Sequence, residues 1–158
     1  MLRNRSVLAA LTNKQSREDG TLTQDEIKWL ERRAKDGFGI VTTAAAFIHP
    51  SGKSWIGELG VHSDDMLPGL ENLSERIRLH GAVSLVQIFH GGMRAPTDLT
   101  GEVPISSSVI RPNNPQQAIR VLWKSKRLKK QYNGLQMLQK DAQMQVSTAS
   151  RYTARTDI

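Results

Sequence analysis

Residues 19–47, DGTLTQDEIKWLERRAKDGFGIVTTAAAF, contain a complete helix-to-strand unit. Ile27, Leu30 and Ala34 follow one another at spacings of three and four, which places them on one face of a helix. Residues 39–46 are small or β-branched, as in a strand that is buried on both faces of a sheet. A helix that leads directly into such a strand indicates a parallel α/β architecture.

The ends of this predicted helix are marked in the sequence. Thr23-Gln24-Asp25-Glu26 is a capping box, in which the Thr23 hydroxyl accepts the amide proton of the third residue on and Glu26 reaches back to the cap. Gly37 is placed to end the helix.

The same alternation continues on both sides of residues 19–47. Arg5–Ala9 is a short candidate strand, residues 63–80 form a second candidate helix, and Ala82–Phe89 (AVSLVQIF) is a third strand. The second helix carries three apolar residues on its inner face: Leu70, Leu73 and Ile77. Because no G-x-G-x-x-G or P-loop motif follows any strand, a nucleotide-binding Rossmann domain is disfavoured. The (β/α)8 barrel is the other large parallel architecture.

The charge of the 158-residue chain is divided unevenly. Its formal net charge is +7, yet residues 1–118 hold 13 Lys/Arg and 13 Asp/Glu, whereas residues 119–158 hold 9 Lys/Arg and only 2 acids. Of the 12 glycines, only Gly134 lies in the last 40 residues. We therefore predict a domain over residues 1–118 and an irregular or helical basic tail over residues 119–158.

Composition excludes several classes of protein and site. The chain has no cysteine, which excludes disulfides and thiolate zinc sites. Its four histidines show no metal-ligand spacing, so we expect no metal. No apolar run approaches the roughly 20 residues of a membrane span, and the N-terminus lacks a signal-peptide pattern. We expect a soluble, cytoplasmic protein.

The carboxyl ends of the predicted strands hold the candidate site residues, because parallel barrels carry their chemistry there. The ends are Ala10-Leu11-Thr12, residues 43–46, and residues 87–90. Gln87 is an amide within an apolar strand, where we expect it to be buried. A buried amide must be hydrogen-bonded, and either a ligand or neighbouring backbone could be its partner. The alanine run allows close approach to a flat ligand or tight helix–strand packing. By spacing alone His90 is a loop or core histidine, and His49 and Trp55 are surface or lid residues.

Four segments together resemble the old yellow enzyme family of FMN-dependent NAD(P)H oxidoreductases. They are residues 4–13 (NRSVLAALTN), 19–47, 49–70 (HPSGKSWIGELGVHSDDMLPGL) and 80–96 (HGAVSLVQIFHGGMRAP), which agree in order and spacing. The resemblance implies a (β/α)8 barrel with FMN across the strand ends. It also implies hydride transfer from NADH or NADPH through the flavin to a small-molecule acceptor, such as an activated alkene or an enoyl thioester.

The resemblance implies specific cofactor-binding residues. Ala10, Leu11 and Thr12 match the family segment whose backbone and hydroxyl meet the flavin ring. Ala45 matches the small residue beneath the isoalloxazine, and Gln87 matches the amide that hydrogen-bonds the pyrimidine edge of FMN. The family usually has Pro at the position of Ala10 and Glu at the position before Ala45.

Parts of the family pattern are missing from this sequence. A bare barrel needs about 250 residues, so we expect an incomplete (β/α)8 TIM barrel holding the first three to four βα units. The strand-four motif resembling E-I-H-x-A-H-G-Y, which carries the family's substrate-binding pair and proton-donating Tyr, is absent, as is the phosphate-binding half. We therefore assign no catalytic residue and expect little or no NAD(P)H oxidation by this chain alone.

The basic tail has two competing interpretations. A basic tail can bind nucleic acid or an acidic membrane, which would make the chain a non-catalytic half-barrel binding protein. Alternatively, codons for Gln145–Ile158 read one nucleotide earlier permit A-G-F-D-G-L-E-I-H-G-A-H-G-Y, which is similar to the family's strand four. We hypothesise an out-of-frame tail and expect no nucleic-acid or membrane partner. Any helix over about residues 116–144 would then lack a continuous inner face.

Overall fold

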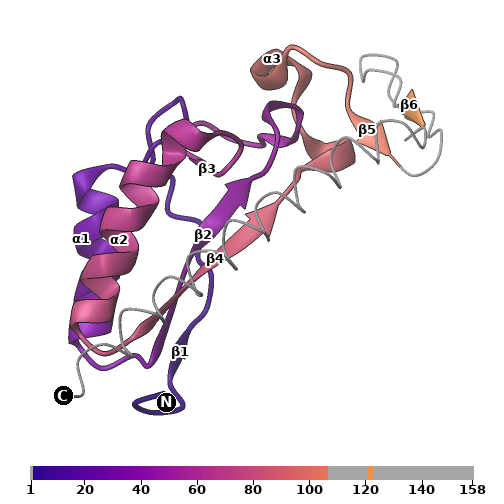
Figure 1. Cartoon of the computed structure of the whole chain (residues 1–158). Helices are drawn as coiled ribbons and strands as arrows, with labels where there is room; N and C mark the ends of the chain where they lie inside the picture. The colour runs from indigo at the N-terminus through magenta and orange to yellow at the C-terminus, as the bar shows by residue number, and fades with distance from the viewer. Residues whose placement is uncertain (1, 107–120, 123–158) are drawn as a thin grey trace. The chain divides into compact units, whose positions relative to one another are not determined.

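The computed structural model describes residues 2–106 and 121–122, which belong to one compact unit spanning residues 1–122 (Figure 1). Its helices are α1 (Gln24–Lys35), α2 (Leu67–Leu79) and α3 (Thr97–Thr100), with short 3-10 turns η1 (Pro50–Gly52), η2 (Asp64–Met66) and η3 (Gly92–Arg94). Its strands are β1 (Val7–Leu8), β2 (Ile40–Phe47), β3 (Leu59–Gly60), β4 (Val83–Phe89), β5 (Ile105–Ser106) and β6 (Val121–Leu122).

Strand β2 is the centre of a four-stranded parallel sheet. Strand β4 pairs with it from Ile40 opposite Val83 to Phe47 opposite Phe89. Strands β1 and β3 pair with the start and the end of β2, respectively. Figure 1 shows α1 and α2 side by side along one face of this sheet. Helices that connect neighbouring parallel strands are βαβ units, so the predicted incomplete barrel is confirmed.

The core lies between the two helices and the sheet. The predicted inner face of α1 is buried, with Leu30 and Ala34 at 0% exposure and Ile27 at 2%. Leu73 and Ile77 of α2 are buried in the same cluster, and Leu70 packs against it while partly exposed. Six of the eight residues of β2 are buried, as predicted for a central strand.

Strand β4 is exposed on both faces. Leu85 is 47% exposed on one face, and Val86 and Ile88 are 42% and 51% exposed on the other. Exposed apolar side chains on both faces of a parallel strand are expected where a sheet stops before it closes into a barrel. The predicted strand over Ala82–Phe89 is therefore present without the burial that a closed barrel would give it.

The structure differs from the sequence prediction mainly at element ends. The first strand is shorter than Arg5–Ala9, because only Val7 and Leu8 pair with β2. The sequence prediction has no strand at the position of β3, which lies between the predicted strand over residues 39–46 and the second predicted helix. Of the predicted basic tail, the structure describes only Val121 and Leu122, which pair with β5 as β6. The boundary at residue 118 and the proposed helix face lie outside the described residues and stay predictions.

No helix among residues 2–106 and 121–122 has the length and apolar character needed to cross a membrane.

Candidate functional site

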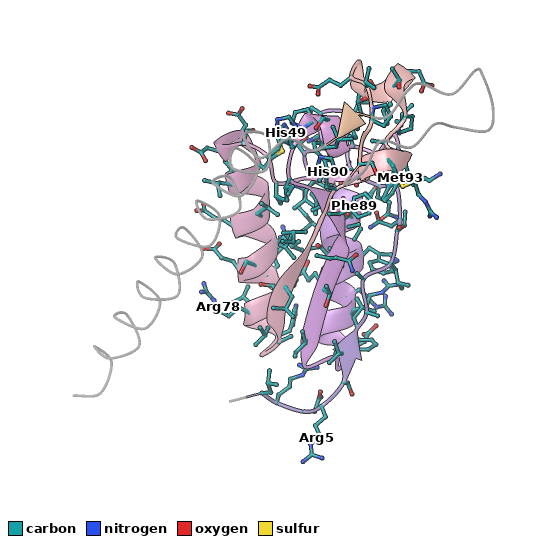
Figure 2. The ribbon with its side chains drawn as sticks, turned by 90° about the vertical axis from the view of Figure 1, so that its right-hand side faces the viewer. Arg5, His49, Arg78, Phe89, His90 and Met93 are labelled. Carbon is teal, nitrogen blue, oxygen red and sulfur yellow. The ribbon has the colours of Figure 1, made fainter. Side chains whose placement is uncertain are left out.

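The carboxyl edge of the sheet brings together the predicted cofactor-binding residues of β2 and β4. Ala45 and Gln87 are direct Cα partners across these strands. Residues Ala10–Thr12 follow β1, which is the parallel neighbour of β2. Figure 2 shows His49, Phe89 and His90 near this end of the sheet, with Arg5 at the opposite end.

A β-bulge in β2 creates the Ala45–Gln87 pairing. Thr42 pairs with Leu85 and Ala45 with Gln87, so the two residues between them in β2 oppose one residue of β4. The Thr43 hydroxyl, in a side chain only 1% exposed, accepts a hydrogen bond from the Gln87 N–H (3.3 Å) and donates one to the Ala44 carbonyl (2.8 Å). Because side chains alternate along a strand, this extra residue moves Ala45 to the same face as Gln87.

The side chain of Gln87 is exposed. The expectation of a buried amide at this position is therefore wrong: its main-chain N–H is what neighbouring residues bind. Burial fails because β4 lies at the unclosed side of the sheet. The exposed carboxamide can donate and accept hydrogen bonds, which suits the polar edge of a flat heteroaromatic ring.

The segment Ala10–Thr12 presents unpaired backbone. No hydrogen bond joins the main chain of these three residues to another described residue. Leu11 and Thr12 are exposed, and Ala10 is half-buried. Unpaired N–H and C=O groups need water or a ligand as partner, so this segment fits the predicted contact with a flavin ring.

The loop after β1 is anchored to α1 by Glu26. As predicted, the Thr23 hydroxyl accepts the Glu26 N–H (3.2 Å). The carboxylate of Glu26 does not serve the cap, however: it accepts the Asn13 side-chain amide at 3.1 Å and the Ser16 hydroxyl at 2.5 Å. The capping box is therefore half formed, because two side-chain donors of the preceding loop reach the Glu26 carboxylate.

The loop after β2 is joined to the loop after β4 by two histidines and a serine. His49 Nδ1 lies 2.8 Å from the Ser51 hydroxyl, which lies 3.3 Å from His90 Nε2. His90 Nδ1 accepts the Gly92 N–H (2.9 Å), so the ring proton sits on Nε2 and points to Ser51. Burial and the nearby His49 lower the pKa of His90. His90 is therefore a neutral residue that connects two loops, which agrees with its reading as a loop histidine.

Main-chain hydrogen bonds hold the loop after β2 between its neighbours. The Ser16 N–H donates to the Gly57 carbonyl (3.3 Å), and the Gly60 N–H donates to the Gly20 carbonyl (2.8 Å). On the other side, the Gly91 N–H donates to the Gly52 carbonyl (2.8 Å). The three loops at this edge are thus tied together.

Glu58 is a buried carboxylate within the loop after β2. Its side chain is 1% exposed, and its Oε2 accepts the Ser54 N–H at 2.6 Å. Burial raises the pKa of Glu58 to about 6, against the opposing effect of the hydrogen bonds from the Ser54 and Trp55 main chain. The Trp55 ring lies 5.5 Å from the ring of Phe89 at the end of β4, so this loop reaches the site.

Sequence reasoning missed three features of this edge: the Thr43 bulge, the carboxylate anchor of Glu26 and the buried Glu58. The run G-E-L-G at residues 57–60, a charge between glycines beside an apolar residue, was the available signal for Glu58. No group of three or more His, Cys, Asp or Glu side chains that could hold a metal occurs in the described part of the chain.

These features form a candidate ligand site at the carboxyl ends of parallel strands, the edge at which parallel barrels carry their chemistry. The chain belongs to the NADH:flavin oxidoreductase / NADH oxidase family, whose model matches residues 1–156. It is 35% identical over 121 residues to the probable NADH-dependent flavin oxidoreductase YqiG of Bacillus subtilis (strain 168), covering 77% of this chain and 32% of that protein. It is 33% identical over 110 residues to the NADH:acrylate oxidoreductase of Vibrio harveyi, covering 69% and 11%.

Solved structures share the fold. A 2-naphthoyl-CoA reductase in complex with 2-naphthoyl-CoA matches with a TM-score of 0.76 at 25% identity, over 84% of this chain and 22% of that one. The old yellow enzyme homologue from Zymomonas mobilis matches with a TM-score of 0.73 at 19% identity, over 84% and 40%. This chain therefore spans less than half the length of these relatives. The predicted family and fold are confirmed. For the family as a whole, the predicted class of flavin oxidoreductase and the use of FMN with a nicotinamide reductant are confirmed as well.

Proposed function

We propose that this chain forms the flavin-ring side of an FMN-dependent NADH or NADPH oxidoreductase. The pairing of Ala45 with Gln87 at the carboxyl edge carries the proposal, since it sets a methyl side chain beside an exposed carboxamide on one face. When bound, FMN would pass a hydride from the nicotinamide to a small-molecule acceptor, an activated alkene or an enoyl thioester.

Each site residue has a role in this proposal. The carboxamide of Gln87 holds the polar edge of the ring, because it offers both a donor and an acceptor. Ala45 leaves room for the ring plane to approach the strand. The backbone of Ala10–Thr12 supplies further hydrogen bonds, and the Thr12 hydroxyl adds a side-chain partner.

We propose that the chain by itself does not turn over NADH or NADPH. Reduction of an alkene requires a positioned proton donor, and the sequence holds no strand-four His/Tyr motif. We also propose that the protein lies in the cytoplasm. Without cysteine, the chain cannot form the disulfides that are common in proteins of oxidising compartments. Its partners in this proposal are small molecules and not nucleic acid.

Titration of FMN with the full chain, followed by quenching of flavin fluorescence, tests the proposal. We expect saturable binding by the unmodified chain and at least tenfold weaker binding by Gln87→Leu. The control is Gln24→Leu, the same change at an exposed position of α1, which should bind as the unmodified chain does. Equal affinity of all three proteins, or no binding at millimolar FMN, would overturn the proposed flavin site.

The binding-protein alternative predicts a different measurement. A tail that docks on polyanions loses affinity steeply as salt rises, whereas the flavin proposal predicts no such binding.

The nucleotide sequence across codons 110–158 and beyond the stop tests the out-of-frame hypothesis. We expect one shifted frame to continue into a strand-four motif with two His and a Tyr, and the absence of such a frame would refute the hypothesis.

A further inference from the structure

We propose that Glu26 is a positioning residue for the flavin-contacting segment Ala10–Thr12. This inference rests on the proposed function, because it concerns the segment that would meet the ring. It goes beyond that proposal by assigning a role to a helix residue that does not itself lie at a strand end.

Glu26 is held in place on both its main chain and its side chain. It lies in the first turn of α1, is 0% exposed, and its N–H is held by the Thr23 hydroxyl. Both carboxylate oxygens are used: Oε1 accepts from the Asn13 amide (3.1 Å) and Oε2 from the Ser16 hydroxyl (2.5 Å). Because each oxygen has a donor at a different loop residue, Glu26 fixes two points of the loop.

The turn that Glu26 holds is not one the chain adopts readily. Lys14 has φ +54°, the only positive value at a non-glycine residue in the described part of the chain, and this region is unfavourable for a side chain with a Cβ. The Asn13 side-chain oxygen accepts the Gln15 N–H (3.2 Å) across the turn. Because Glu26 holds the other end of the same carboxamide, it orients Asn13 for this bond.

Neighbouring contacts complete the anchor. The Thr23 hydroxyl donates to the Gln15 carbonyl (2.8 Å), and the Ser16 N–H donates to the Gly57 carbonyl (3.3 Å). A Cβ at Gly57 would lie 2.5 Å from the Lys14 carbonyl oxygen, so the two loops touch closely. Asn13–Ser16 is thus fixed to α1 and to the loop after β2.

The position of the segment Ala10–Thr12 is set by the residues at its two ends. One end is Leu8, paired with Val41 in the sheet, and the other is Asn13. Since the backbone between them makes no hydrogen bond to another described residue, the Glu26–Asn13 anchor sets where its free N–H and C=O groups point.

The experiment compares the full chain with Glu26→Ala, Glu26→Gln and a control, Glu31→Ala. Gln keeps an acceptor for Asn13 and can donate to the Ser16 hydroxyl, whereas Ala leaves both loop donors unpaired. Glu31 lies on the same helix and Glu31→Ala removes the same side chain, but the partners of Glu31 are Arg76 (2.9 Å) and His80 (3.4 Å) of the α2 region. The readouts are amide hydrogen exchange and FMN affinity.

We expect the amides of Gln15 and Ser16 to exchange at least tenfold faster in Glu26→Ala, relative to the amide of Leu30 in the core. We expect FMN affinity to fall at least tenfold in the same variant. Glu26→Gln should recover both to within about threefold, as expected when a hydrogen-bonding side chain of the same length is retained, and Glu31→Ala should leave both unchanged.

If the unmodified chain binds FMN and Glu26→Ala changes neither amide exchange nor FMN affinity, the proposed role of Glu26 is overturned and the proposed function stands. Failure of the unmodified chain to bind FMN would overturn the proposed function, and the flavin role of Glu26 with it. If Glu26→Ala does not fold, the variant Asn13→Ala tests the anchor instead. It removes one of the two partners of Glu26 and leaves the buried carboxylate bonded to Ser16. Faster exchange at Ser16, whose N–H bonds to the Gly57 carbonyl and not to Asn13, supports the anchor, and unchanged exchange at Ser16 refutes it.

Discussion

Replacing Glu58 by Gln should change how the stability of the protein depends on pH. Burial raises the pKa of Glu58 from its ordinary value of 4.5 to about 6, so the folded protein binds a proton there more tightly than the unfolded chain does. The contribution of Glu58 to stability is therefore greatest below pH 4.5 and is lost as pH rises through 6.

The size of this loss follows from the pKa. A tenfold change in proton binding corresponds to about 1.4 kcal/mol, so an ionised Glu58 costs the folded state about 2 kcal/mol relative to the protonated form. A neutral Gln keeps an acceptor for the Ser54 N–H and removes the titration. The free energy of unfolding of Glu58→Gln minus that of the unmodified chain should therefore rise by about 2 kcal/mol between pH 4 and pH 7.

Urea denaturation at several pH values, followed by circular dichroism, measures this difference. Taking the difference between the two proteins at each pH cancels the titration of all other groups. A pH-independent effect of the new amide, such as an unpaired N–H next to the buried Oε1 position, shifts this difference equally at every pH and leaves its change between pH 4 and pH 7 unaffected. A difference that stays constant from pH 4 to pH 7 would show that Glu58 titrates normally and that its burial has no energetic consequence.

Further substitutions test the core and the tight turns. Leu30→Ala should lower the free energy of unfolding by about 2–5 kcal/mol, whereas Leu79→Ala, at 81% exposure, should change it by less than about 0.5 kcal/mol; urea denaturation of both measures the contrast, and equal effects would contradict the burial. Gly20→Ala should cost more than about 2 kcal/mol, because its φ is +91° and the new Cβ would lie 2.9 Å from Phe47; Gly101→Ala, with φ +67° and open space around it, should cost about 1 kcal/mol. Thermal melts compare the two glycine variants, and a smaller loss at Gly20 would be inconsistent with the packing. His62 and His90 should titrate below 6.5 by NMR, because burial lowers the pKa of both; a higher value at either would show that the ring is solvated.

The helices and the central strand were predictable because their patterns are local. Spacings of three and four residues placed Leu30 and Ala34 on the inner face of α1, and the small and β-branched run marked β2. The Thr23 cap was predictable for the same reason, since donor and acceptor lie three residues apart. Such features depend on residues that are close in sequence.

The details of the candidate site were not predictable because they depend on contacts distant in sequence. The Glu26 carboxylate has a local partner available at its own cap, and only the folded loop shows that Asn13 and Ser16 bind it instead. The bulge at Thr43 depends on its register with Leu85 and Gln87, more than 40 residues away. Exposure of Gln87 depends on what lies beyond β4, which an alternating strand pattern does not encode.

The main-chain hydrogen bonds between the three loops bear on how this edge of the protein can evolve. Bonds such as Gly91 N–H to the Gly52 carbonyl use no side chain, so substitutions at exposed loop positions such as Ile56 leave the loop geometry intact. The glycines themselves are different: a Cβ at Gly52 would lie 2.5 Å from His90, and one at Gly91 would lie 2.1 Å from the Ser54 hydroxyl. A lineage carrying this edge can therefore vary its loop side chains, and with them the ligands it meets, as long as these glycines stay in place.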